Sequence, residues 1–283
     1  MTASRPKVLV TGASGLLGGL TVKHLKDKYE FSALNRSRTA DFAHTKTADM
    51  DDTIPWTQAD ISDFDAMLPA FEGIDMVVHM ANYTGEADSW EQHLSAGIIG
   101  TRNVYEAARL NGVKRVVLGS TGDTMTGYEC DPPYGYLAAG KYAKVKWGWS
   151  MVDQTWPTRP VSVYGACKVF CEALGHHYSD VFDMSVLVIR LGAVLEPDGP
   201  SLRRHYPGWL GQQDYVSMVD KCLSAPMSLR YDIFDAISNN KYKWRNTTHA
   251  SDVLGWVPQQ SVDDHDIEDK GGWHQVNMFH GEK

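Results

Sequence analysis

The stretch Lys7–Gly19, KVLVTGASGLLGG, decides the fold of this chain. An apolar run ends at Thr11, glycines follow at positions 12, 15 and 18, and a helix-compatible run continues to residue 28. Strand, glycine turn and helix is the order that a dinucleotide site requires. The first glycine permits the turn, the second lets backbone approach a pyrophosphate, and the third lets the helix pack on the strand. The helix N-terminus then offers N–H groups and a positive dipole end to phosphates.

Composition limits the classes of partner. The chain has 283 residues, of which 43% are hydrophobic and 22% charged, as in ordinary globular proteins. The formal net charge of −8 argues against nucleic acid, whose phosphates need clustered Lys and Arg. No apolar run of about 18 residues predicts a membrane span. We expect no signal peptide, and four cysteines without a C-x-x-C pair indicate a reduced, cytoplasmic protein.

One cysteine pair raises the question of a metal site. Cys167 and Cys171 are four residues apart on a predicted helix, and His176 and His177 follow closely. Buried thiols and partly exposed histidines are the simpler interpretation of this cluster. We therefore expect no metal.

Up to about residue 195, predicted strands alternate with predicted helices. The predicted strands cover 8–10, 31–35, 56–60, 74–81, 113–118 and 185–191, and the predicted helices cover 63–71 (capped by Ser62), 90–110 and 164–178. This alternation predicts an α/β fold, a Rossmann-type doubly wound parallel sheet. We divide the chain into a dinucleotide-binding domain, 1–195, and a small C-terminal substrate-binding portion with its tail, 196–283. That portion is predicted to hold a helix at 215–223 and a strand at 231–237, and to close its last folded element at Pro258.

Ligands on parallel sheets bind outside the carboxyl ends of the strands. Gly12, Arg36, Asp60, Ala81 and Thr121 all fall at those ends. His79 lies inside the apolar fourth strand, and we expect it to be a core residue whose ring is satisfied.

The end of the second strand bears on the choice of cofactor. NAD sites place Asp or Glu there to bind ribose hydroxyls, whereas Arg suits the additional phosphate of NADP. This chain has Asn35-Arg36, with Arg38 close by. The sequence therefore favours NADP. In the alternative, both arginines are solvated loop charges and Asn35 serves NAD.

An aromatic-rich insertion, 123–160, interrupts the alternation and follows a strand end on the ligand side. It contains several tyrosines and tryptophans and the pair Pro132-Pro133. Such a segment is expected to lie over the site, where its aromatic rings could stack on a ligand or bury a partner subunit. Equally, the rings could form a small satellite core under the loop. Both interpretations stay open.

A tyrosine four residues before a lysine on a helix places both side chains on one face. A tyrosine is a poor base at its ordinary pKa near 10, and an adjacent ammonium and a cationic nicotinamide would lower that pKa. A hydroxyl at a nearby strand end would hold the substrate oxygen while hydride moves to or from the nicotinamide.

This spacing occurs twice, at Tyr142–Lys146 and Tyr164–Lys168. Only the second lies in a predicted helix that feeds a strand and shows an apolar stripe, formed by Val169, Phe170, Ala173, Leu174 and His177. We therefore assign Tyr164 and Lys168 as catalytic, with Thr121 as the hydroxyl partner and Ser120 beside it.

At this point the chain resembles the extended short-chain dehydrogenases/reductases, also described as NAD-dependent epimerases/dehydratases. The motifs, in the family's order, are TGASGLLG at 11–18, Asp60-Ile61, VVHMA at 77–81, Ser120-Thr121, YGACK at 164–168 and RLG at 190–192. The resemblance implies cofactor contacts from Gly12, Ser14, Gly15, Leu16, Leu17, Gly18, Asn35, Arg36, Asp60, Ile61, Met80, Ala81, Asn82, Tyr164, Lys168, Gly192 and Ala193. Asp60 would touch adenine, Lys168 the nicotinamide ribose, and the backbone at Gly192–Ala193 the nicotinamide.

Within this family the chain is most similar to uronate dehydrogenases, which implies oxidation of a small sugar or sugar acid. Arg204 would then pair with a substrate carboxylate and Thr84 would bind a sugar hydroxyl, with Ser120, Thr121 and Asp123 also lining the substrate site. Asp123 would repel an anionic substrate. Family members commonly pair through helices that flank the sheet, so a homodimer is expected. The alternative is a nucleotide-sugar epimerase or dehydratase with tightly bound NAD, against which the short C-terminal portion argues.

Overall fold

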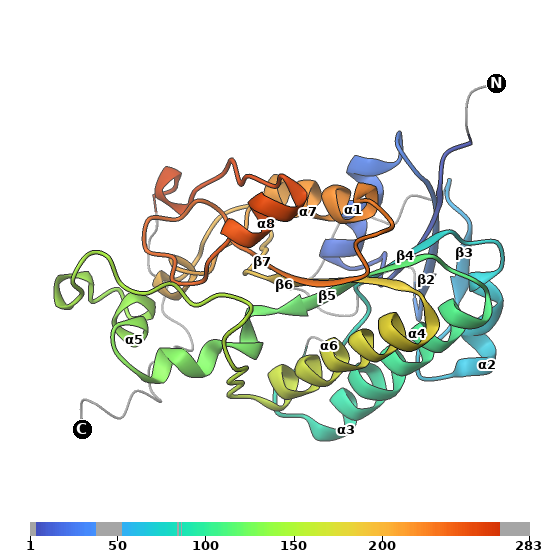
Figure 1. Cartoon of the computed structure of the whole chain (residues 1–283), viewed down its shortest axis with the longest axis horizontal. Helices are drawn as coiled ribbons and strands as arrows, with labels where there is room; N and C mark the ends of the chain where they lie inside the picture. Colours follow the sequence, from blue (N-terminus) through green and yellow to red (C-terminus); the bar gives the residue numbers. More distant parts are fainter. Residues whose placement is uncertain (1–3, 38–52, 84, 86, 267–283) are drawn as a thin grey trace.

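The computed structural model describes residues 4–37, 53–83, 85 and 87–266. In this part of the chain seven strands form one sheet in the order β3-β2-β1-β4-β5-β6-β7 (Figure 1). The strands are β1 (Lys7–Thr11), β2 (Glu30–Asn35), β3 (Trp56–Gln58), β4 (Met76–His79), β5 (Arg115–Thr121), β6 (Ser185–Leu191) and β7 (Tyr231–Ala236). Every neighbouring pair is parallel, so the predicted doubly wound parallel sheet is confirmed.

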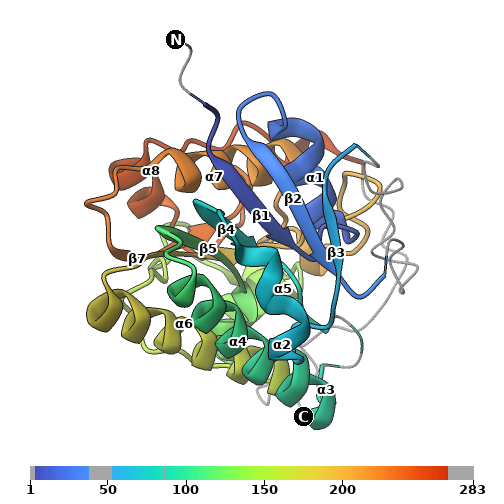
Figure 2. The same ribbon diagram turned by 90° about the vertical axis from the view of Figure 1, so that its right-hand side faces the viewer.

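Helices cover both faces of the sheet (Figure 2). One face carries α1 (Leu16–Leu25), α7 (Gln212–Ser224) and α8 (Thr248–Leu254), and the other carries α2 (Phe64–Met67), α4 (Gly100–Leu110) and α6 (Val163–Phe182). Along β1, Val8 and Val10 pack into the core under α1 and α7, whereas Leu9 packs into the core over α4 and α6. Because side chains alternate between faces and both faces are covered, these strands read as unbroken apolar runs.

The strand and helix bounds follow the predictions with local differences. β6 has the predicted bounds, whereas β5 starts and ends later than predicted and so includes Ser120 and Thr121. The predicted cap Ser62 is wrong, because Asp63 accepts from the Ala66 N–H at 3.1 Å and so caps α2. A 3₁₀ turn, Leu68–Phe71, continues α2 beyond Met67.

The predicted helix 90–110 consists of three consecutive segments. It begins as α3 (Trp90–Gln92), widens into a π-helical stretch, His93–Ile99, and ends as α4. The Cys171 thiol donates to the Gly97 carbonyl in this stretch at 3.4 Å. π-turns inside helices are frequent beside functional sites.

The apolar stripe predicted for α6 is wrong. Its members include Phe170, which is 40% exposed, and the exposed Ala173 and His177. The face toward the sheet instead carries Gly165, Cys167, Lys168, Cys171, Glu172, Gly175, Tyr178 and Ser179. Lys168 sets this orientation, because its Nζ donates to the Gly119 carbonyl of β5 at 2.7 Å.

The insertion forms a satellite core, as one of the two open interpretations predicts. Its buried members are Met125, Tyr134, Leu137, Val152 and, from the C-terminal portion, Trp244. Tyr142 stacks on Tyr242 with ring centroids 3.6 Å apart. The insertion contains the short helix α5 (Tyr134–Ala138). Tyr142 itself lies in a three-residue 3₁₀ turn, so Tyr142 and Lys146 do not share a helix.

The C-terminal portion completes the sheet, since α7, β7 and α8 lie in the same layers as the rest. The proposed division at residue 195 therefore separates two expected roles, cofactor binding and substrate binding, and does not separate two sheets. Val262, in the turn Val262–Asp264, is buried and its N–H donates to the Asn240 amide oxygen at 2.9 Å, so the start of the predicted tail docks on the body. Residues 267–283 lie outside the described part. Among the described residues no helix combines the length and apolar character needed to cross a bilayer.

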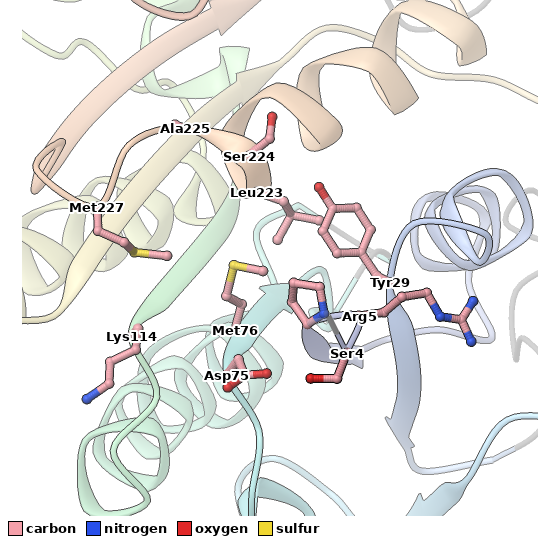
Figure 3. A pocket seen from close by; sticks show the side chains of 11 residues that line it. Ser4, Arg5, Tyr29, Asp75, Met76, Lys114, Leu223, Ser224, Ala225 and Met227 are labelled. Atoms are coloured by element: carbon pink, nitrogen blue, oxygen red, sulfur yellow. The ribbon is translucent and has the colours of Figure 1, made fainter. Parts of the chain in front are cut away.

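A hollow of about 550 Å³ lies at the opposite edge of the sheet from the strand ends that the sequence singles out (Figure 3). Its lining includes Tyr29, Asp75, Met76 and Lys114, which come just before or at the amino ends of β2, β4 and β5. Ligands on parallel sheets bind at the carboxyl ends. We therefore build the candidate site at that other edge.

Candidate active site

The glycine turn between β1 and α1 is shaped for close approach. Gly12 has φ +76°, and a Cβ there would lie 2.7 Å from the Ala81 nitrogen. At Gly18 a Cβ would lie 2.4 Å from the Gly12 carbonyl oxygen. Gly15 begins α1 without any side-chain cap, and the first turn of the helix carries no acidic residue. A turn without side chains before an uncapped helix N-terminus fits a dinucleotide pyrophosphate.

The other predicted members of this turn have distinct surroundings. Leu16 is buried in the core, and the Leu17 carbonyl accepts from the Tyr215 hydroxyl at 3.0 Å. The Ser14 N–H donates to the Asn35 amide oxygen at 3.4 Å, which joins the turn to the end of β2.

A guanidinium and a carboxylate lie near each other at the end of β2. The Arg36 guanidinium is 54% exposed and lies 3.9 Å from Asp60 Oδ2, while the other Asp60 oxygen accepts from the Ser62 N–H and hydroxyl. The structure thus brings Asn35, Arg36 and Asp60 together, and in the described residues at the end of β2 no carboxylate takes the position typical of NAD sites. Ile61 is buried against Gly100, and Arg38 lies outside the described residues.

The segment after β4 lies directly against the glycine turn. The Met80 N–H donates to the Thr11 carbonyl at 3.1 Å, and the Ala81 N–H donates to the Thr11 hydroxyl at 3.2 Å. Asn82 follows; its amide oxygen accepts from the Tyr83 N–H, and its Nδ2 is buried without a hydrogen bond to any described residue. Thr84 lies outside the described residues.

His79 is a core residue, as predicted. Its Nδ1 lies 2.7 Å from the Thr11 hydroxyl and its Nε2 lies 3.1 Å from the Thr101 hydroxyl. Burial lowers the pKa of His79 to about 3, so the ring is neutral.

After β6 the chain is fixed by backbone pairing. Gly192 donates to the Ala236 carbonyl and Ala193 to the Gly208 carbonyl, each at 2.8 Å. A Cβ at Gly192 would lie 2.4 Å from the Gly208 oxygen, so only glycine fits. Both N–H groups are therefore bonded within the chain. Neither N–H group is left to donate to a ligand.

Tyr164, Thr121 and Lys168 meet between β5 and α6. Ser162 caps α6 by accepting from the Gly165 N–H at 2.9 Å, which places Tyr164 in the first turn. The Thr121 hydroxyl at the end of β5 accepts from the Asp123 N–H at 3.2 Å, so its own proton points elsewhere. That hydroxyl lies within hydrogen-bonding reach of the Tyr164 phenol and acts to lower the pKa of Tyr164.

Lys168 and a bound nicotinamide together are expected to lower the pKa of Tyr164, whereas in the chain alone the surroundings of the phenol raise it. Burial raises the pKa of Tyr164, and the nearby Asp123 carboxylate raises it further. Lys168 is buried, its Nζ is held on Gly119, and burial lowers its own pKa. The neutral phenol is therefore the favoured form before a ligand adds positive charge.

His93 contacts the site, and no motif in the sequence singles it out. Its ring lies 5.5 Å from the Tyr164 ring and 5.3 Å from the Tyr83 ring, centroid to centroid. It comes from the first residue of the π-helical stretch. The ring contact helps to fix the position of Tyr164.

Ser120 does not face the candidate site, contrary to the prediction. Its hydroxyl is buried and donates to Glu172 Oε1 at 2.6 Å. Glu172 forms a two-point ion pair with the buried Arg190, at 3.0 and 2.8 Å. The Ser120 side chain is therefore held in the core against α6, and Thr121, the last residue of β5, is the member of this pair that reaches Tyr164.

Arg204 reaches the site already bound to a carboxylate. Its guanidinium contacts both oxygens of Glu129 at 3.1 Å, and Glu129 also accepts from the Trp244 Nε1–H at 3.2 Å. Glu129, from the insertion, is buried, and this burial raises its pKa. Sequence reasoning missed Glu129 because its partners lie 75 and 115 residues away.

Asp123 lies within the electrostatic reach of Tyr164, Arg204 and Arg245. Arg245 donates to Asp235 Oδ1 at 2.8 Å and packs over Gly122, where a Cβ would lie 2.6 Å from the guanidinium. The Arg245–Asp235 ion pair was not predicted from the sequence either.

The two cysteines and the two histidines near them on α6 have different surroundings. Cys167 and Cys171 are buried, and His176 and His177 are exposed, as the simpler interpretation predicts. Within the described ranges no group of three metal-ligating side chains is found.

The chain matches a known protein family and is similar to several known dehydrogenases. The model of the NAD dependent epimerase/dehydratase family matches residues 8–223. The NAD-dependent glucose-6-phosphate dehydrogenase of Haloferax volcanii is 29% identical over 257 residues, which cover 90% of this chain and 93% of that protein. The L-arabinose 1-dehydrogenase (NAD(P)(+)) of the same organism is 28% identical, with 90% and 97% covered. The crystal structure of uronate dehydrogenase from Agrobacterium tumefaciens has a TM-score of 0.74 and 28% identity, with 92% of this chain and 86% of that chain covered.

Proposed function

Because the chain belongs to the NAD dependent epimerase/dehydratase family, we propose that it is a dehydrogenase that moves hydride between a nicotinamide cofactor and a carbon of a small sugar or sugar acid. The observation that carries this proposal is the meeting of the Tyr164 phenol and the Thr121 hydroxyl at the carboxyl edge of the sheet. The glycine turn, also at that edge, fits the cofactor. Three relatives with printed activities on sugars or uronates support the substrate class.

In the proposed reaction, a hydroxyl of the substrate lies between Thr121 and Tyr164. The Thr121 hydroxyl donates a hydrogen bond to the substrate oxygen, and the Tyr164 phenolate takes the proton of that oxygen. An oxidised nicotinamide, when bound at this edge of the sheet, would supply the acceptor for the hydride. The carbon–hydrogen bond breaks as the carbonyl forms, so protons and electrons balance. Lys168, on the buried face of α6, would hold the nicotinamide ribose.

The proposed cofactor is NADP, with NAD as the alternative. The support is the exposed Arg36 guanidinium at the end of β2, where it could pair with a ribose phosphate. Asp60, close to Arg36, would contact the adenine. Gly192 and Ala193, which follow β6, would border the nicotinamide.

The experiment that tests the function is a nicotinamide-reduction assay. Purified protein is incubated separately with NADP and with NAD, and a panel of hexuronates, aldoses and small alcohols is added. We expect reduction with a sugar-type substrate and a higher kcat/KM with NADP. Copurification of bound NAD, with no net reduction for any substrate, would instead support the epimerase alternative.

We also infer a homodimer formed through α4 and α6. These helices lie side by side on one face of the molecule (Figure 2). The apolar side chains exposed on and around them are Ile99, Leu110, Phe170, Val181 and Phe182, each at least 40% exposed. Exposed apolar patches of this kind commonly mark protein interfaces.

The proposed location is the cytoplasm. Its support is that all four cysteines are unpaired thiols, three of them buried.

A further inference from the structure

Four charged side chains lie within electrostatic reach of one another on the side of the insertion, and one of them, Asp123, also acts on Tyr164. They come from separate segments of the chain: Asp123, Glu129, Arg204 and Arg245. In a partly buried site, uncompensated charge strongly influences which ligands can enter. The pairing among these four, and with Asp235, therefore bears on the charge of the substrate.

Both guanidinium groups are engaged. Arg204 contacts both oxygens of Glu129 at 3.1 Å, and the exposed fraction of its side chain is 17%. Arg245 donates to Asp235 Oδ1 at 2.8 Å and to the Arg190 carbonyl at 3.2 Å, and the side chains of Arg245 and Asp235 are 5% and 1% exposed. A substrate carboxylate would have to compete with these internal carboxylates for the arginine donors.

Asp123 is the member of these four that forms neither of the two ion pairs just described. Its N–H donates to the Thr121 hydroxyl at 3.2 Å and its carbonyl accepts from the Thr126 hydroxyl at 3.2 Å, so its backbone is fixed beside the reacting groups. Its carbonyl also packs against α6, since a Cβ at Gly165 would lie 2.7 Å from that oxygen. Among the described residues, none forms a hydrogen bond with the Asp123 carboxylate, which is partly exposed.

An ionised carboxylate only accepts hydrogen bonds. Sugar hydroxyl groups are donors that match it, whereas a second carboxylate brings repulsion that is strong at low dielectric. Three carboxyl groups, from Asp123, Glu129 and Asp235, lie near the guanidinium groups of Arg204 and Arg245. Burial raises the pKa of each carboxyl group, and the nearby guanidinium groups lower it.

We propose that Asp123 binds the hydroxyl groups of a neutral sugar and selects that sugar against the corresponding uronate. This inference rests on the proposed dehydrogenase function and specifies its substrate class. The Arg204–Glu129 pair supports the selection, because the arginine that a uronate would need is already neutralised.

The test uses two matched substrate pairs, D-galactose with D-galacturonate and D-glucose with D-glucuronate. Within each pair, only the group at C6 differs, hydroxymethyl in one sugar and carboxylate in the other. In at least one pair we expect kcat/KM for the neutral sugar to exceed that for the uronate about tenfold or more, as like-charge repulsion implies. In Asp123→Asn this ratio should fall about fivefold or more, because repulsion is relieved and an acceptor is weakened.

Asp65→Asn is the matched control. It makes the same change of charge at an exposed position on α2, and its ratio should equal that of the wild type. A wild-type preference for the uronates, or an Asp123→Asn ratio equal to that of the control, would overturn the proposal.

Failure of the proposed function gives a different result. If no sugar is oxidised with either cofactor, calorimetric titration of the same pairs into NADP-saturated protein decides the selectivity separately. Tighter binding of the neutral sugar, lost in Asp123→Asn, supports the inference even without turnover. Tighter binding of the uronate, or binding of neither, overturns it.

Discussion

At the residue scale, Tyr164 is surrounded by groups that oppose the charge it needs as a base. Burial, the Asp123 carboxylate and the Cys171 thiol raise its pKa, and the Thr121 hydroxyl alone lowers it. Lys168, on the same helix, is held on the Gly119 carbonyl. The positive charge that stabilises a phenolate must therefore come largely from the bound cofactor. Proton abstraction is thereby tied to cofactor binding.

The pH dependence of kcat/KM follows from this arrangement. The reacting form of Tyr164 is deprotonated and its pKa is raised, so activity should increase with pH into the alkaline range. Removing the Asp123 charge lowers the pKa of Tyr164, so the rising limb should move to lower pH in Asp123→Asn, by about half to one unit. The measurement is kcat/KM against pH for both proteins with a neutral sugar. A limb that stays in place, or moves to higher pH, would contradict the role of Asp123.

At this scale the glycine turn before α1 and the meeting of Tyr164 with Thr121 could be predicted from the sequence. It could not place Ser120, because the partner that holds its hydroxyl, Glu172, lies 52 residues away on α6. It could not find Glu129 or Arg245, because their partners are brought close only by the folded insertion and the C-terminal portion.

At the element scale, the β1–α1 unit was the most predictable, because sterics dictate its glycines. A Cβ at Gly18 would meet backbone atoms of Gly12 and Ala13 at 2.4 and 2.6 Å, and backbone cannot rotate away. The orientation of α6 was the least predictable. Its sheet-facing side carries Lys168, which donates to the Gly119 carbonyl of β5, and Glu172, which accepts from Ser120 of β5 and Arg190 of β6. Because these buried side chains are charged, hydrophobicity pointed to the wrong face of the helix.

Gly18→Ala should therefore destabilise the protein, even though alanine favours helices. Overpacking against backbone should lower the free energy of unfolding by about 2 kcal/mol, and NADP affinity should fall as the turn shifts. Urea denaturation and a cofactor titration measure these two effects. Gly208→Ala is the control, because an added Cβ there meets open space. Equal stability of both variants would show that α1 can move away from the turn without loss.

At the scale of the whole molecule, the predicted parallel α/β architecture and the family were confirmed. Strands that alternate with helices are joined by right-handed crossovers, which limit such a chain to a few topologies. The function of the insertion was not determined by composition. Its aromatic residues needed Trp244 and Tyr242, more than 80 residues away from most of them, to form a packed cluster.

The exposed apolar side chains of α4 and α6 carry a prediction about assembly. The wild type should sediment at twice the mass of one chain. Phe170→Glu should give a monomer, because it places a charge in the centre of the proposed interface. Val257→Glu, at a position 58% exposed after α8, is the control and should remain dimeric. A monomeric wild type would refute the proposed interface.

The central claim is that Tyr164 moves the proton while a nicotinamide cofactor takes the hydride. The most direct measurement compares wild type with Tyr164→Phe, using nicotinamide reduction for turnover and fluorescence titration for NADPH binding. We expect a loss of kcat of about a hundredfold or more with NADPH affinity nearly unchanged, because only the phenol oxygen is removed. Turnover retained by Tyr164→Phe at the wild-type rate would exclude Tyr164 as the residue that moves the proton.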